Sequence, residues 1–190
     1  MKQLRYLGDP VLREICKEVS EITPHIKKIV AELLETVKAH EGAGLAAPQI
    51  GYPLRIFVNA YSHEVDSEGF ALCLEKPEVY INPVITKFSK KKFTTAEGCL
   101  SIPGASADVS RSHDIEIEYT NLKGERVQGV FETRWRAKCL QHELDHLNGV
   151  LYFDHISQKD LQRIKPTLVK LENKTLTLKR SVVMPKDFLA

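Results

Sequence analysis

Two histidines lie four residues apart in the stretch QHELDHLNGV, residues 141–150, with a glutamate directly after the first. On a helix this spacing puts His142 and His146 on one face, where both imidazoles could bind one divalent ion. Glu143 would then point toward the ion and serve as a general base for a water molecule. A motif this short can arise by chance on an amphipathic helix, so it needs a third ligand to support it.

A catalytic metal site usually has three protein ligands and one open position. Downstream, the long metzincin pattern would place a histidine at position 152, which is Tyr152 here, and His155 lies three residues too late. Glu172 remains a candidate third ligand for a metallopeptidase of another type. That alternative stays open at this point.

Two cysteines are further candidates. Cys139 shares a helical face with the histidines, but seven helical residues rise about 10 Å, whereas ligands must lie about 2 Å from one ion. We therefore predict that Cys139 is a buried core thiol. Cys99 follows a glycine at the end of a predicted strand, so its thiolate could approach a helix from elsewhere in the fold, although such a cysteine is also common as a small apolar residue. One thiolate and two neutral imidazoles leave a divalent ion at net +1, still able to acidify water.

The elements that position these residues follow from periodicity. A long helix is predicted from Thr23 as N-cap and Pro24 in the first turn up to the glycines at 42 and 44, and a second helix from 133 to 148 with Gly149 just beyond its end. This pattern is typical of an α+β fold in a single domain, with a catalytic part at 1–156. The remaining predictions are strands at 54–60, 79–86 and 115–120, a hairpin turn at 121–124, a surface excursion at 61–78, and a C-terminal amphipathic helix and tail at 157–190 that belongs to the same domain or forms an appendage.

Composition excludes several classes of protein. The chain has 190 residues, 43% hydrophobic and 27% charged, with a net charge of +2, which argues against disorder, fibres and a strong field that would attract DNA. The first residues contain no continuous apolar run, so neither a secretory signal nor a membrane partner is expected. Four cysteines without a CxxC pair predict free thiols in a reducing compartment, and we expect a cytoplasmic protein.

Three separated stretches taken together resemble the signature motifs of the peptide deformylases, in the same order and at similar separations. They are GAGLAAPQ at 42–49, EGCLS at 97–101 and QHELDH at 141–146. The resemblance runs from about residue 3 to residue 156 and includes GDPVLR near the start and INPVI before the second motif. It implies an α+β fold in which antiparallel strands surround a central metal-binding HExxH helix.

The resemblance also implies an activity, the removal of the formyl group from N-formylmethionine at the start of nascent peptides, with transient ribosome contact as a further expectation. Its metal ligands would be Cys99, His142 and His146, holding iron(II) as the usual native ion, with zinc or nickel able to replace it. Glu143 would be the general acid and base. The side chain of Gln49 and the backbone N–H of Leu100 would stabilise the oxyanion.

Further roles follow from motif position. Glu97 is expected to support a ligating histidine, and Arg111 to pair with Asp145. The glycine-rich loop permits close approach of the substrate chain, and an apolar pocket should take the methionine side chain, with help from Ile50, Leu100 and Leu140 or the region around residue 135. The expected substrate contacts are Gly44, Leu45, Ile50 and Gly98.

The chain also departs from the family pattern. Many deformylases have an arginine where this sequence has Ser106, so that substrate contact is lost or supplied elsewhere. Arg134, Trp135 and Arg136 stand where relatives often have a small residue and an aliphatic pair, and an arginine here either faces solvent or grips a peptide. Three alternatives therefore remain: a metallopeptidase, a binding protein with a structural ion, and an inactive family member. The oligomeric state stays open.

Overall fold

The computed structural model describes residues 2–68, 71–131 and 134–183, and its strands form two antiparallel sheets. The larger sheet has the strand order β1-β2-β3-β6-β7, so β1 is one of its edges. The smaller sheet pairs β4 with β5. The bounds of the strands are β1 Gly44–Ala46, β2 Ile56–Val65, β3 Ala71–Phe88, β4 Lys92–Cys99, β5 Ile102–Ser112, β6 Ile115–Thr120 and β7 Arg126–Phe131. The helices are α1 Pro24–Ala39, α2 Arg134–Leu147 and α3 Gln158–Val183, with short 3-10 turns η1 Pro10–Arg13, η2 Ala47–Ile50 and η3 Tyr152–His155.

Helix α1 forms as its sequence predicts. The Thr23 side chain accepts a hydrogen bond from the backbone N–H of Ile26, and Pro24 occupies the first turn, where a missing N–H costs nothing. One face of the helix is buried against β1, β2 and η2. The helix ends at Ala39, a little before the glycines expected to stop it. Its buried residues are Ile26, Ile29, Val30, Leu33, Thr36 and Val37.

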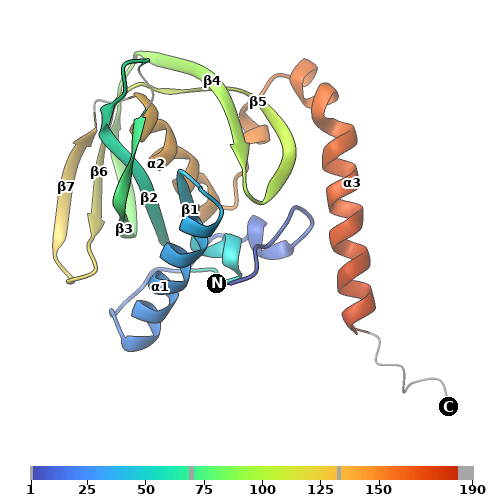
Figure 1. Cartoon of the computed structure of the whole chain (residues 1–190), viewed down its shortest axis with the longest axis horizontal. Coiled ribbons are helices and arrows are strands. Elements are labelled where there is room, and N and C mark those ends of the chain that lie inside the picture. Colours follow the sequence, from blue (N-terminus) through green and yellow to red (C-terminus); the bar gives the residue numbers. More distant parts are fainter. Residues whose placement is uncertain (1, 69–70, 132–133, 184–190) are drawn as a thin grey trace.

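Helix α2 confirms the second predicted helix and lies between the two sheets, with contacts to β1, β2, β3, β5 and β7 (Figure 1). Gly149, just beyond its end, has a left-handed φ of 70°, as expected for a residue that closes a helix. The predicted start at Thr133 lies outside the described residues. The apolar side of α2 shares one core cluster with the larger sheet, formed around Ala46, Phe57, Tyr80, Ala137, Leu140 and Leu147.

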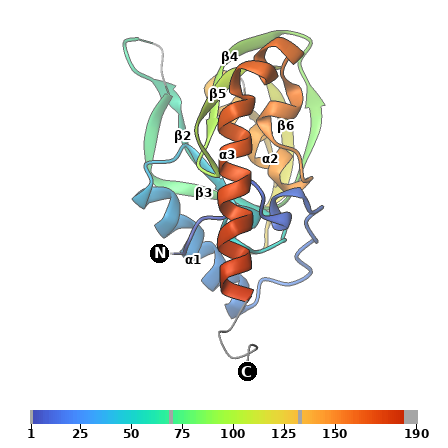
Figure 2. The same ribbon diagram turned by 90° about the vertical axis from the view of Figure 1, so that its right-hand side faces the viewer.

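The segment at 61–78, predicted as a surface excursion, continues the two neighbouring strands over much of its length. Tyr61 pairs with Cys73 and Val65 with Ala71, so β2 and β3 extend beyond the predicted strands into a long hairpin that projects from the body (Figure 2). The polar composition that suggested a loop fits a hairpin that leaves the core. The turn at 121–124 is confirmed, with β6 and β7 pairing from Ile115 opposite Phe131 to Thr120 opposite Arg126.

The C-terminal helix α3 runs on through Pro166 and lies against β5 (Figures 1 and 2). Ile164 and Leu168 are buried in a cluster that includes Leu7, Ile102 and Val109. The amphipathic pattern after residue 157 is therefore explained by packing on the body. No helix within the described ranges is both long enough and apolar enough to cross a membrane.

Candidate metal centre and active site

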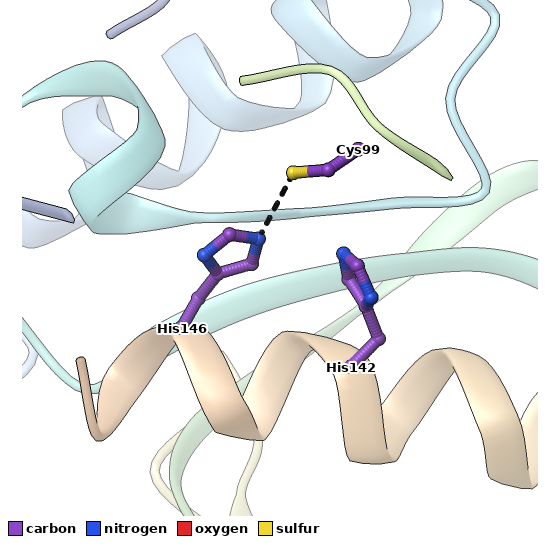
Figure 3. Close-up of side chains that lie close together, drawn as sticks. All are labelled: Cys99, His142 and His146. Carbon is purple, nitrogen blue, oxygen red and sulfur yellow. Dashed lines mark hydrogen bonds between the residues drawn. The ribbon is translucent and has the colours of Figure 1, made fainter. Parts of the chain in front are cut away.

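Cys99, His142 and His146 converge from two distant parts of the chain. Their ligand atoms all lie within 4.8 Å of one another, and Cys99 Sγ is 3.3 Å from His146 Nε2. Figure 3 shows both rings rising from α2 toward the sulfur, which comes from the last residue of β4. A register shift between Glu97 and Cys99 interrupts the ladder with β5 at this point, and such bulges re-aim side chains.

The environment of Cys99 favours the thiolate. Burial alone would raise the pKa of its thiol, but the charge of His146 and hydrogen bonds with both histidines lower the pKa to about 5. Cys139 is the contrast: its Sγ contacts the carbonyl oxygen of Ala43, and burial raises its pKa well above the usual value. Cys139 lies outside the three-residue cluster, which confirms the prediction of a buried core thiol. A soft sulfur beside two imidazoles is a donor set suited to a divalent transition ion.

A buried ion-pair network supports His142. Glu97 Oε2 lies 2.9 Å from His142 Nδ1, which leaves the Nε2 side of the ring for an ion. Arg111 donates two hydrogen bonds to the Glu97 carboxylate, at 2.9 and 3.0 Å, and a third of 2.5 Å to Asp145 Oδ2. The structure thus brings together the three residues that motif position had suggested as supports.

Glu143 and Gln49 face the same cluster. Glu143 is buried, and its Oε2 has no hydrogen-bond partner among the described residues. Burial raises its pKa to about 7. Gln49 Oε1 accepts a hydrogen bond of 2.8 Å from the Ala46 N–H, which turns Nε2 toward Cys99 Sγ at 3.4 Å and Ser101 Oγ at 3.2 Å. An unpartnered carboxylate and an oriented amide donor therefore flank the three ligand atoms.

A cavity of about 450 Å³ opens beside the cluster, and its lining includes Gly44, Gly98 and Leu100, three of the residues expected near the substrate. The expected contacts of Leu45 and Ile50 need correction, because both side chains are fully buried in the core cluster that packs on α1 and do not line the cavity. The backbone turns from β1 into η2 here and directs these two side chains inward. Leu140 is likewise a core residue.

The three residues of the unusual stretch 134–136 lie in three different environments. Arg134 is exposed, with its guanidinium over the ring of Phe93. Trp135 lines the cavity. Arg136 is buried, pairs with Glu78 and donates to the Tyr80 hydroxyl at 3.1 Å, so it neither faces solvent nor grips a peptide. Helical periodicity could have indicated this, because position 136 shares the buried face of α2 with positions 140, 143 and 147.

Two further residues line the cavity, Tyr61 and Lys138. Helical periodicity could have indicated Lys138, which lies four residues before His142 on α2, whereas only tertiary structure brings Tyr61 of β2 there. At the Ser106 departure, Arg163 from α3 donates a hydrogen bond of 3.1 Å to the Ser106 carbonyl oxygen. A guanidinium thus lies at this point of β5, although it comes from a helix far along the chain.

Comparison with known proteins identifies the family. The family model for polypeptide deformylase matches residues 1–162. The chain is 40% identical over 171 residues to a peptide deformylase of Pseudothermotoga lettingae, covering 90% of this chain and 92% of the relative, and 42% identical over 163 residues to that of Bartonella bacilliformis, covering 83% and 86%.

Solved structures agree with this match. A peptide deformylase from Arabidopsis thaliana superposes with a TM-score of 0.81 at 32% identity, over 98% of this chain and 97% of that one. The enzyme from Thermotoga maritima gives a TM-score of 0.73 at 38% identity, over 83% and 98%. On both sequence and fold, the chain belongs to the polypeptide deformylase family.

Proposed function

We propose that this protein hydrolyses the N-formyl group of N-formylmethionyl nascent peptides and releases formate. The observation that carries the proposal is the convergence of one thiolate and two imidazoles beside a buried, unpartnered glutamate, in a chain of the deformylase family. A formamide carbonyl attacked by water becomes a tetrahedral oxyanion, and this site provides a proton acceptor and donors for that oxyanion.

One divalent ion would be held by Cys99, His142 and His146, so that α2 is the central metal-binding helix of the fold. The fit rests on the donor set and on the free Oε2 of Glu143, a buried acceptor that requires a partner. When bound, such an ion supplies Lewis-acid chemistry, polarising a carbonyl oxygen and making water more acidic. We propose iron(II) as the native ion, because it is the usual ion of the family that the motifs resemble. Zinc or nickel could replace it, because one thiolate and two imidazoles suit all three.

The chain's own residues carry the proton and hold the oxyanion. Glu143, a buried carboxylate with a free Oε2, takes a proton from the attacking water and passes it to the departing amine. Gln49 Nε2, fixed by the bond that its Oε1 receives from Ala46, donates to the developing oxyanion, and the backbone N–H of Leu100 is the second donor. Glu97 keeps the His142 ring in orientation throughout.

The peptide would bind as an added strand. β1 is an edge of the larger sheet, and the segment from Gly42 to Gly44 lines the cavity. Gly98 lines the same cavity from β4, and a Cβ there would meet only the Ala105 carbonyl oxygen, at 3.9 Å. An extended peptide between these backbones would hydrogen-bond with the edge strand and place its first carbonyl at the metal ligands.

The substrate sets the cellular context of the proposal. Formylated chains exist where translation begins with formylmethionine, so the proposal includes a cytoplasmic location and transient contact with the ribosome. The catalytic unit proposed is 1–156, with the following helix packed on it through Ile164 and Leu168.

The deciding experiment measures formate release from formyl-Met-Ala-Ser under anaerobic conditions, with the protein loaded with iron or nickel. The parent should release formate, and Glu143→Ala, with the same metal content, should be at least about 10²-fold slower because it lacks the general base. A loaded parent that releases no formate would overturn the proposal.

A metallopeptidase is the nearest rival, and the geometry does not favour it. Glu172, its candidate ligand, lies on α3 next to Gly8, away from the cluster. Measuring bound metal in Cys99→Ala separates the two: a deformylase site loses its ion, whereas a site completed by a downstream carboxylate keeps it. A closed structural site would need a fourth ligand, and the cluster within the described residues has three.

A further inference from the structure

The short turn η3 lies next to the last turn of α2 and is itself held firmly. Arg13 donates to both oxygens of Asp154, at 2.5 and 3.2 Å, and Asp154 Oδ2 accepts a hydrogen bond of 2.8 Å from the Leu151 N–H. His155 follows Asp154 and places its Nε2 2.7 Å from Asp145 Oδ2. The turn thus presents an imidazole to the carboxylate that neighbours metal ligand His146.

His155 is the outer end of a continuous chain of charged contacts. Asp145 Oδ2 accepts from His155 and from Arg111 Nη1, Arg111 forms its two-pronged pair with Glu97, and Glu97 binds His142 Nδ1. The exposed fraction of the side chain falls along this series of contacts, from 39% for His155 to 19% for Asp145, 6% for Arg111 and 1% for Glu97. The series therefore links a solvent-facing side chain to a buried metal ligand.

The same turn contacts His142 a second time. The ring of Tyr152 is buried and stacks on the His142 ring, with the centroids 6.4 Å apart and the planes 19° from parallel. Glu97 fixes the edge of the His142 imidazole, and Tyr152 covers a face of it. Two side chains of this turn therefore support His142. Tyr152 contacts it directly, and His155 is linked to it through three ion-pair partners.

We propose that His155 is a positioning residue for metal ligand His142, acting through Asp145, Arg111 and Glu97. This inference rests on the proposed function of the site. The physical reason is the geometry of Arg111: with Nη1 occupied by Asp145, its Nε and Nη2 present a planar fork to Glu97, and Asp145 keeps its orientation because His155 donates to the same oxygen. Loss of that donor would free Asp145 to turn toward water. It would then loosen the contacts from Arg111 to Glu97 and from Glu97 to His142.

The test measures retention of cobalt(II) rather than turnover. The protein is loaded with Co²⁺, its visible bands are recorded, and the release of Co²⁺ to a chelator is followed. His155→Leu should release the ion about 3- to 10-fold faster than the parent, because residues that orient ligands typically change metal affinity by about 10- to 100-fold and His155 acts at a distance. His155→Gln keeps an N–H donor and should restore release to within about twofold of the parent.

A matched control is available in His113, whose Nδ1 lies 2.5 Å from Asp114 Oδ1 in a histidine–aspartate pair that does not lead to the cluster. His113→Leu should leave the cobalt spectrum and the release rate unchanged. Asp145→Asn should accelerate release, and adding His155→Leu to it should have no further effect, because both interrupt one chain.

Equal release rates for His155→Leu and the parent, or full additivity with Asp145→Asn, would overturn the inference. If His155→Leu does not fold, His155→Phe is measured instead, and a release rate equal to that of the parent counts against the inference in the same way. Because no substrate is present, a failed formate assay would refute the proposed function without touching this result.

Discussion

Gly44 passes so close to the general base that replacing it by alanine tests the proposed role of Glu143. A Cβ at this position would lie 2.7 Å from Glu143 Oε1 and 2.9 Å from Cys139 Sγ. Ordinary contact begins at 3.4 Å, so the carboxylate oxygen must retreat by about 0.7 Å, the difference between the two distances. The perturbation moves the base while leaving its chemistry intact.

The size of the effect follows from that displacement. A misplacement of about 1 Å in a catalytic geometry costs about 10²-fold, so Gly44→Ala should lower kcat by about 10- to 100-fold, equivalent to about 1.4 to 2.7 kcal/mol. Overpacking should also lower stability by about 1 to 3 kcal/mol. Metal content should match the parent, because the new methyl group meets Glu143 and Cys139 rather than the three ligands.

The assay is steady-state formate release from formyl-Met-Ala-Ser, with metal measured in each preparation. Gly98→Ala is the matched control, since its Cβ meets only the Ala105 carbonyl oxygen at 3.9 Å and lies on the cavity wall. It should raise KM by obstructing the peptide while kcat stays near that of the parent. A parental kcat in Gly44→Ala, or a kcat loss explained by missing metal, would refute the reasoning.

Three further predictions concern ionisation and packing. In the metal-free protein at pH 7, iodoacetamide should label Cys99 before Cys139, because the pKa of Cys99 is about 5 and that of Cys139 is raised. Added metal should protect Cys99. Peptide mass spectrometry measures both rates, and faster labelling of Cys139 would contradict the prediction. Burial alone would raise the pKa of Glu97, but hydrogen bonds from His142 and Arg111 lower it from 4.5 to about 2, so its stabilisation is present above pH 4.5 and is lost as pH falls toward 2. Glu97 should therefore contribute a loss of about 2 kcal/mol to the urea unfolding free energy of the metal-free protein between pH 5 and pH 3. Glu97→Gln should lose about that much less than the parent over the same interval, and equal losses in parent and variant would contradict the prediction. Arg136→Leu should cost about 1 to 2 kcal/mol by calorimetry while metal content stays parental, because it removes the hydrogen bonds of a buried guanidinium but leaves Glu78 38% exposed. A change below about 0.5 kcal/mol would show that the pair adds little.

The parts of the fold that local sequence determines could be predicted. Helix α1 follows from its cap at Thr23 and its apolar stripe, and the hairpin joining β6 to β7 follows from a four-residue turn. The HExxH spacing alone placed two imidazoles on one face of α2. Choosing Cys99 as the third ligand required the combination of three motifs, because no local pattern links a strand end to a distant helix.

The parts that depend on tertiary contacts could not be predicted. Arg136 pairs with Glu78, 58 residues away, and a single sequence does not reveal that partner. Leu45 and Ile50 belong to the motif at the cavity, but the backbone path from β1 into η2 determines which of its side chains turn into the core. Polar residues at 61–78 resemble a loop locally, whereas pairing of Tyr61 with Cys73 makes them strands.

The edge position of β1 has a consequence for the range of peptide substrates. Backbone amides and carbonyls are common to all polypeptides, so an enzyme that binds its substrate at a strand edge would recognise nascent peptides by their shared main chain. Selectivity then depends on the first residue, and later positions are free to vary. Under the proposed binding mode, one such catalyst would act on new proteins of many different sequences.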